Sequence, residues 1–142
     1  IVFVVDNSSS MDENALAQIL AELSSLMENI DYESLRIIGC DSRVNYDEEF
    51  SRGEAFNFGD MTSGGGTKFM PAFDYVAENC DQVDLLIYFT DMEVYARNSP
   101  EESPEYPVLW AVYGTTLEND EWTMANCSTW FCPDWGTRIK VA

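Results

Sequence analysis

Oxygen-bearing side chains alternate in one short stretch near the start of the chain. Asp6, Ser8 and Ser10 occupy every second position of the sequence DNSSS, so in an extended loop their side chains point to the same side. Carboxylates and hydroxyls suit hard cations, and Mg²⁺ takes near-octahedral oxygen ligation while keeping several waters. Because the chain has no His, we expect Mg²⁺ or Mn²⁺ as the bound ion, with Ca²⁺ less favoured.

Two later residues lie where they could join such a site. Thr67 follows the glycines at 64–66 and precedes a helical pattern, and Asp91 follows an apolar, strand-like run. In open α/β sheets, ligands bind beyond the carboxyl ends of parallel strands, where the strand order reverses. Asp6 also follows a strand-like run, so we expect the three loops to meet at one edge of a sheet.

Each of these residues also has an ordinary structural explanation. Ser10 and Glu13 have the form of a capping box at a helix start, and the rest of DNSSS could be a polar turn. Thr67 could cap the following helix. The glycines at 64–66 could form a flexible connection, whereas a phosphate loop would require the GK[ST] ending that this chain lacks.

The elements that would position these residues alternate between strands and helices. Three apolar runs predict buried strands at Ile1–Val5, Leu35–Cys40 and Leu85–Phe89. A weaker, polar strand at Glu48–Phe56 suits a sheet edge, and further strands are expected at Val108–Tyr113 and Thr137–Val141.

Two stretches have apolar residues at helical spacing. The first starts at Ala15, and the second runs from Phe69 to Cys80 with Pro71 tolerated in its first turn. Glu93–Tyr106 is expected to be a surface loop, and Thr115–Gly136 is rich in Trp without a clear period. The pattern predicts an α/β fold with a mostly parallel central sheet flanked by helices, and one antiparallel edge strand.

Composition limits the class of protein and its partners. With 142 residues, 46% of them hydrophobic, the chain is expected to be one domain with a packed core, residues 1–142. Its 26 acidic and 7 basic residues give a formal net charge of −19, which disfavours nucleic acid and anionic membranes and suits cationic partners. Oligomeric state is left open.

The cysteines and the ends of the chain carry less information. Cys40, Cys80, Cys127 and Cys132 include no CxxC pair and no His accompanies them, so free or structural thiols are expected rather than zinc. Whether Cys127 and Cys132 form a local disulfide is left undecided by their spacing.

No membrane span or signal peptide is visible, so the cytoplasm is the default location. Because Ile1 already begins a strand, we expect a piece of a longer protein.

Three motifs in order resemble the metal-ion-dependent adhesion site of von Willebrand factor A domains. DNSSS at 6–10 matches that family's DxSxS motif, GGGT at 64–67 is similar to the loop with its threonine ligand, and YFTD at 88–91 to the strand end with its second aspartate. The resemblance covers the chain through Tyr113. It implies the three-layer, Rossmann-like von Willebrand factor A fold.

The same resemblance implies roles for the site residues. Ser8, Ser10 and Thr67 would be direct ligands through their hydroxyls, and Asp6 and Asp91 would bind the ion directly or through water. The family's metal keeps a coordination position that a Glu or Asp of a partner protein fills. This implies a non-enzymatic, metal-dependent protein-interaction domain.

Within the family, the chain is similar to bacterial domains that follow a metallopeptidase-like region and associate with MoxR-type AAA ATPases. GCDSRV at 39–44, GGGTKF at 64–69 and YPVLWAV at 106–112 carry this narrower resemblance. It implies a cytoplasmic accessory protein with an AAA ATPase as partner. Two positions differ: Lys68 stands where relatives often have Asp, and Met92 where Gly is usual, which makes a sharp turn after Asp91 harder.

Two other functions remain as alternatives. A metal-assisted hydrolase would use the ion to activate water, but the chain offers no obvious general base. A structural domain with a degenerate metal site would make its contacts through the Trp-rich segment. For the aromatic residues of that segment, core packing is favoured over a recognition patch; they are Trp122, Trp130, Phe131 and Trp135. A solvated acidic face is the favoured reading of Asp41, Glu93, Glu101, Glu102 and Glu105.

Overall fold

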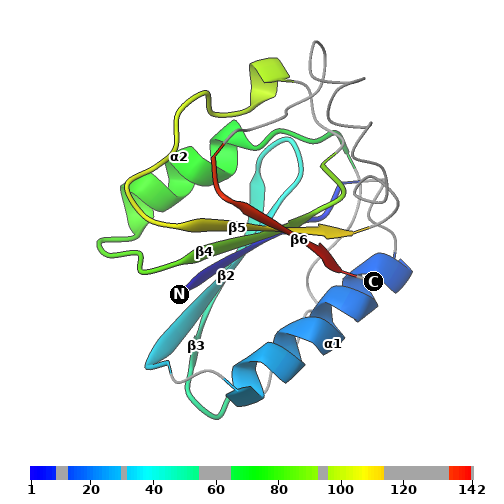
Figure 1. The fold of residues 1–142 in the computed structure, drawn as a ribbon, viewed down its shortest axis with the longest axis vertical. Helices are drawn as coiled ribbons and strands as arrows, with labels where there is room; N and C mark the ends of the chain where they lie inside the picture. The colour runs from blue at the N-terminus through cyan, green and yellow to red at the C-terminus, as the bar shows by residue number, and fades with distance from the viewer. Residues whose placement is uncertain (9–12, 30–31, 55–64, 93–95, 114–134, 142) are drawn as a thin grey trace.

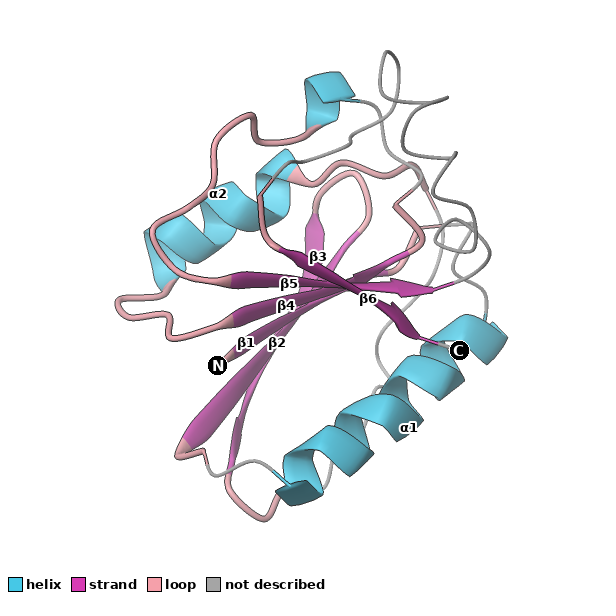
Figure 2. Ribbon diagram, in the orientation of Figure 1, coloured by secondary structure: helices cyan, strands magenta, loops and turns pink. Residues whose placement is uncertain are grey.

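In the part of the chain that the structure describes, a single sheet lies between two α-helices. The computed structural model describes residues 1–8, 13–29, 32–54, 65–92, 96–113 and 135–141. Helix α1 covers one face of the sheet and helix α2 the other (Figure 1), so the three layers are helix, sheet and helix (Figure 2). The elements are β1 (Val2–Asp6), α1 (Glu13–Asn29), β2 (Ser34–Cys40), β3 (Val44–Ser51), α2 (Met70–Asn79), β4 (Leu86–Thr90), the 3₁₀ turn η1 (Ala96–Asn98), β5 (Val108–Tyr113) and β6 (Thr137–Val141).

The strand order reverses beside the first strand. Six strands are arranged in the order β3-β2-β1-β4-β5-β6, and every neighbouring pair is parallel except β2 with β3. From β1 the chain builds outward through β2 to β3, and then crosses to β4 on the other side of β1. The carboxyl ends of β1 and β4 therefore form the point where α/β sheets bind ligands.

Alternation along the strands divides the core into two halves. In β1, Val2 and Val4 pack in the cluster under α2, whereas Phe3 and Val5 pack in the cluster under α1. Successive strand side chains point to opposite faces, and both faces are covered by a helix. This explains why all five residues of β1 and all five of β4 are buried.

An aromatic cluster fills the half of the core under α2. Its rings are those of Phe69, Phe73, Tyr88, Trp110 and Trp135, with neighbouring centroids 4.7 to 6.1 Å apart. Trp135 contacts both Phe73 and Trp110, which confirms the expected core packing for this residue. The other aromatic residues of the Trp-rich segment, and Cys127 and Cys132, lie outside the described residues. Cys40 and Cys80 are free thiols.

Most predicted elements agree with the structure, and two differ. Strand β3 spans Val44–Ser51 instead of residues 48–56, because the chain turns back directly after β2 ends at Cys40 and pairs with β2 from Val44 on. The predicted loop at 93–106 contains the turn η1 and the buried residues Ser99 and Pro100. Among the described helices, none has the length and hydrophobicity needed to cross a membrane.

Candidate metal centre

Asp6 is a buried carboxylate at the carboxyl end of β1. The whole of Asp6 is buried, with no solvent-exposed surface. The Ser8 backbone N–H donates to Asp6 Oδ1 over 3.0 Å, and the Thr90 hydroxyl donates to Asp6 Oδ2 over 2.6 Å. The first bond closes a turn in which an aspartate accepts from the residue two places later. Both carboxylate oxygens are therefore held in place by the ends of β1 and β4.

Thr90 forms a similar turn at the end of β4. Its Oγ1 accepts the Met92 N–H over 3.1 Å while its hydroxyl donates to Asp6. Met92 has φ 63° and no exposed surface. This is the left-handed conformation that glycine adopts most readily, so the turn after Asp91 forms although Met92 carries a Cβ. Burial of the Met92 side chain in the core under α2 offsets the backbone cost.

Asp91 brings a second carboxylate to the same place. It is 9% exposed, and its charge acts on Asp6. Burial raises the pKa of the Asp6 carboxyl, hydrogen bonds from Ser8 and Thr90 lower it, and the charge of Asp91 raises it; the resulting pKa is about 6. A buried carboxylate beside a like charge is costly to ionise. This environment fits a bound cation.

The loop that carries Thr67 is attached to the end of β2, next to β1. The Lys68 N–H donates to the Asp41 carbonyl over 3.1 Å, and the Cys40 thiol lies 3.7 Å from the Lys68 carbonyl. Cys40 pairs with Asp6 in the sheet. Gly65, at φ 79°, approaches Asp41 so closely that a Cβ would lie 2.8 Å from Asp41 Oδ2. Thr67 is half-buried, and the Lys68 side chain is exposed.

A pair of amides joins the DNSSS loop to the β2–β3 hairpin. Asn7 Nδ2 donates to Asn45 Oδ1 over 2.7 Å, and Asn45 Nδ2 donates to Asn7 Oδ1 over 3.2 Å. The Asn7 side chain passes over Gly39, where a Cβ would come within 2.9 Å of Asn7 Nδ2. The pair fixes the backbone between Asp6 and Ser8. Sequence reasoning missed it, since no local pattern links Asn7 to Asn45.

The predicted ligands are therefore partly assembled. A hydrogen bond joins Ser8 to Asp6, and Asp91 lies close enough for its charge to raise the pKa of the Asp6 carboxyl. Thr67 lies in a loop attached to the neighbouring strand end. Ser10 lies outside the described residues. Within the described part of the chain, no three His, Cys, Asp or Glu side chains form a metal cluster. The predicted set instead combines two carboxylates with three hydroxyls.

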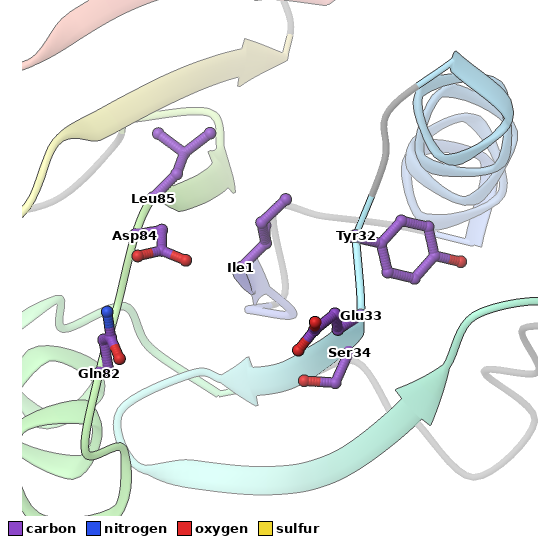
Figure 3. A pocket seen from close by; sticks show the side chains of 7 residues that line it. All are labelled: Ile1, Tyr32, Glu33, Ser34, Gln82, Asp84 and Leu85. Carbon is purple, nitrogen blue, oxygen red and sulfur yellow. The ribbon is translucent and has the colours of Figure 1, made fainter.

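A cavity lies at the opposite end of the strands from the candidate metal centre. Its volume is about 640 Å³. Figure 3 shows Ile1, at the amino end of the sheet, between Asp84 and Leu85 on one side and Tyr32 on the other. None of the described predicted ligands lines this cavity, so it is separate from the candidate metal centre.

Solved structures similar to this chain share the fold at low sequence identity. The ArnB paralog VWA2 from Sulfolobus acidocaldarius has a TM-score of 0.61 and 22% identity, over 80% of this chain and 34% of that one. Proximal thread matrix protein 1 from the mussel byssus has a TM-score of 0.57 and 14% identity, over 80% and 35%. BatB from Bacteroides thetaiotaomicron has a TM-score of 0.55 and 15% identity, over 80% and 65%. The chain thus spans about a third of the first two proteins.

Sequence comparison identifies the family directly. No curated protein matches the chain. The family described as VWA-like domain (DUF2201), however, matches residues 1–141. This range includes the six described strands, α1, α2 and all the predicted ligands. The chain therefore belongs to the VWA-like domain (DUF2201) family.

Proposed function

We propose that this VWA-like domain is a metal-dependent protein-interaction module. The ion, Mg²⁺ or Mn²⁺, is held by Asp6, Ser8, Ser10, Thr67 and Asp91. The observation that carries the proposal is the Asp6 carboxylate, which is fully buried, hydrogen-bonded on both oxygens and close to Asp91. A divalent cation here offsets both the lost hydration and the repulsion between the carboxylates.

The chain's own residues orient the ligands before any ion binds. Thr90 fixes one oxygen of Asp6 and, through the Met92 N–H, shapes the turn that carries Asp91. The amides of Asn7 and Asn45 hold the loop between Asp6 and Ser8. When bound, the ion supplies positive charge and a coordination position for an oxygen of another protein.

We propose that the site binds and does not catalyse. Burial, followed by the charges of Asp6 and Asp41, raises the pKa of the Cys40 thiol to about 12, so this thiol beside Asp6 is protonated and a poor nucleophile. The chain has no His to act as a general base. These features favour binding over the hydrolase alternative.

The proposed partner offers an acidic side chain to the ion, and an AAA ATPase in the cytoplasm is our candidate. A net charge of −19 repels a partner that is acidic throughout. The partner's carboxylate must therefore come from a surface that is otherwise neutral or basic. Membership of the VWA-like family supports a role in protein interaction.

Thermal unfolding in millimolar MgCl₂ tests the metal site. A ligand that binds only the folded state stabilises it, by about 2.7 kcal/mol at a hundredfold excess over Kd. We expect the melting temperature to rise by several degrees, since about 1 kcal/mol corresponds to a few degrees for a domain of this size. The Asp6→Ala and Asp91→Asn variants should lose this rise.

Asp84→Asn is the matched control, because it removes one carboxylate at the opposite end of the sheet, where Asp84 is exposed. It should keep the full response to Mg²⁺. Equal responses in wild type, Asp6→Ala and Asp91→Asn would contradict the proposed ligands. No response in any of the four proteins would favour a structural domain with a degenerate metal site.

A further inference from the structure

A groove beside α2 combines an apolar floor with acidic edges. It runs between α2 and the segment from Pro100 to Tyr106 that leads into β5, and its volume is about 410 Å³. Figure 1 shows this segment, in yellow, passing beside α2 before it enters the sheet. For comparison, a cavity of roughly 150 Å³ can hold benzene, so the groove has room for one large apolar side chain.

Apolar side chains from both walls form the floor. Phe73 and Val76 of α2 are buried, and Val83 and Tyr106 are half-buried beside them. Met70, which also lines the groove, is 42% exposed and is one of the few large hydrophobic side chains with this much exposure among the described residues. Exposed apolar surface with a polar rim is typical of an interaction site.

The edges of the groove are uniformly negative. Asp74 and Asp81 belong to the α2 side, and Glu102 and Glu105 to the opposite wall. All four side chains are exposed, and among the residues that the structure describes, every charged residue lining the groove is a carboxylate. An apolar anchor in this groove is therefore surrounded by negative charge on both sides.

We propose that the groove binds a segment of a partner protein in which one large apolar side chain is flanked by Lys or Arg. The anchor fills the space over Phe73 and Val76, and the basic flanks meet the carboxylates at both edges. Complementary charge speeds association and selects partners, and the net charge of −19 acts in the same direction. Because none of the predicted metal ligands in the described part of the chain lines the groove, the inference goes beyond the proposed function and does not depend on it.

Selection from a random peptide library tests the proposal with an unbiased probe. The intact domain, kept in EDTA, is used to select phage-displayed random peptides, and individual binders are synthesised for affinity measurements. We expect most binders to contain an aromatic residue, Leu or Met next to Lys or Arg. Their affinity should fall as NaCl is raised, since exposed charges are screened.

Two variants connect the binders to the groove. Glu102→Lys/Glu105→Lys reverses one edge and should weaken binding by about tenfold or more, and Ala77→Arg should weaken it by filling the groove from the exposed face of α2. Glu49→Lys/Glu54→Lys makes the same change in net charge at exposed positions of β3 and the turn after it. This control should bind within about twofold of wild type.

Three results would overturn the proposal. Selected peptides without basic residues would contradict the charge argument. Equal affinity for wild type and both groove variants would place the binding surface elsewhere, and a failure to select any binder would show that the groove does not take such segments. Because the selection is done in EDTA, all three outcomes are independent of whether Mg²⁺ binds.

Discussion

At the scale of single residues, the environment of Asp6 makes the folded protein sensitive to pH. The pKa of its carboxyl rises from 3.8 to about 6 on folding, chiefly through burial. Between these pH values the folded protein holds a proton that the unfolded chain has released. Raising the pH through this range therefore lowers the free energy of unfolding, by a total of about 3 kcal/mol.

The Asp6→Asn variant isolates this effect, because its side chain is neutral at every pH. In EDTA, we expect wild type to lose stability relative to Asp6→Asn as the pH rises from about 4 to 7, as measured by urea unfolding. If Asp6 is a ligand, Mg²⁺ near neutral pH should raise the stability of wild type and leave that of Asp6→Asn unchanged. Parallel stability profiles in EDTA would contradict the assigned pKa.

The backbone at Met92 gives a second prediction. A residue with a Cβ in the left-handed conformation carries a cost of about 1 kcal/mol that Gly avoids, and Met92 has φ 63°. Met92→Gly should therefore be more stable than Met92→Ala by about 1 kcal/mol. Both should be less stable than wild type by about 2 to 5 kcal/mol, since a buried Met side chain is removed.

At a helical position Ala should be more stable than Gly, the reverse of the order expected at position 92, and such a position serves as the control. Ala72 is buried within α2, where Gly is less favourable than Ala by roughly 1 kcal/mol. Ala72→Gly should therefore destabilise the protein in chemical unfolding. If Met92→Ala is as stable as Met92→Gly, the strain assigned to the turn after Asp91 is absent.

At the scale of elements, three strand ends at one edge of the sheet are closed by the same kind of turn. Asp6, Asp41 and Thr90 each accept the backbone N–H of the residue two positions later, through a side-chain oxygen. Such turns satisfy N–H groups that the sheet no longer pairs. Side chains at the carboxyl ends of β1, β2 and β4 are thus positioned by local bonds as well as by the sheet.

The edge strand β3 depends on a separate polar network. Arg36 of β2 forms a two-pronged ion pair with Asp47 of β3, and the Tyr75 hydroxyl of α2 donates to the same carboxylate. Arg36 also donates to the Asn79 carbonyl at the end of α2 over 2.8 Å. The network therefore connects β2, β3 and α2.

Removing the charge of Asp47 should loosen β3. Asp47→Asn is expected to cost about 1 to 2 kcal/mol, because two-pronged Arg–carboxylate pairs are stronger than neutral hydrogen bonds, and amide exchange in Val44–Ser51 should accelerate. The hydrogen bond from Arg36 lowers the pKa of Asp47. The stabilisation from this ion pair is therefore present above the unfolded pKa of Asp47 and is lost as the pH falls through its folded pKa.

Glu54→Gln, at an exposed position after β3, is the control and should change neither the free energy of unfolding nor the amide exchange of β3. Equal exchange in both variants would contradict the role of Asp47.

The same elements show what the sequence can predict. Continuous apolar runs identify β1, β2 and β4, since strands covered on both faces have few polar residues. The predicted bounds of β3 were wrong, because its residues are mostly polar and give no apolar pattern that marks the strand. The ion pair between Asp47 and Arg36 forms only in the folded sheet. The sequence could identify Asp6, Thr67 and Asp91 as candidate ligands, because Asp6 and Asp91 follow apolar strand patterns and Thr67 precedes a helical pattern. The bond from Thr90 to Asp6 joins residues 84 positions apart, and no local pattern predicts it.

At the scale of the whole molecule, negative charge opposes folding. With 26 acidic and 7 basic residues, carboxylates repel one another across the surface, and this self-repulsion destabilises the compact state. Both proposed binding sites attract positive charge: the metal centre binds a divalent cation, and the groove beside α2 binds a segment with basic residues. Charge screening must therefore be separated from specific binding in any test of the metal site.

Salt provides that separation. Raising NaCl from about 0.1 M to 1 M shortens the screening length from about 10 Å to about 3 Å, so we expect the melting temperature to rise by several degrees in wild type, Asp84→Asn and Asp91→Asn alike. MgCl₂ at matched ionic strength should add a further rise in wild type and Asp84→Asn alone, because only they keep the full ligand set. If NaCl reproduces the whole effect of MgCl₂, the stabilisation is general screening, and Asp6 and Asp91 do not hold an ion.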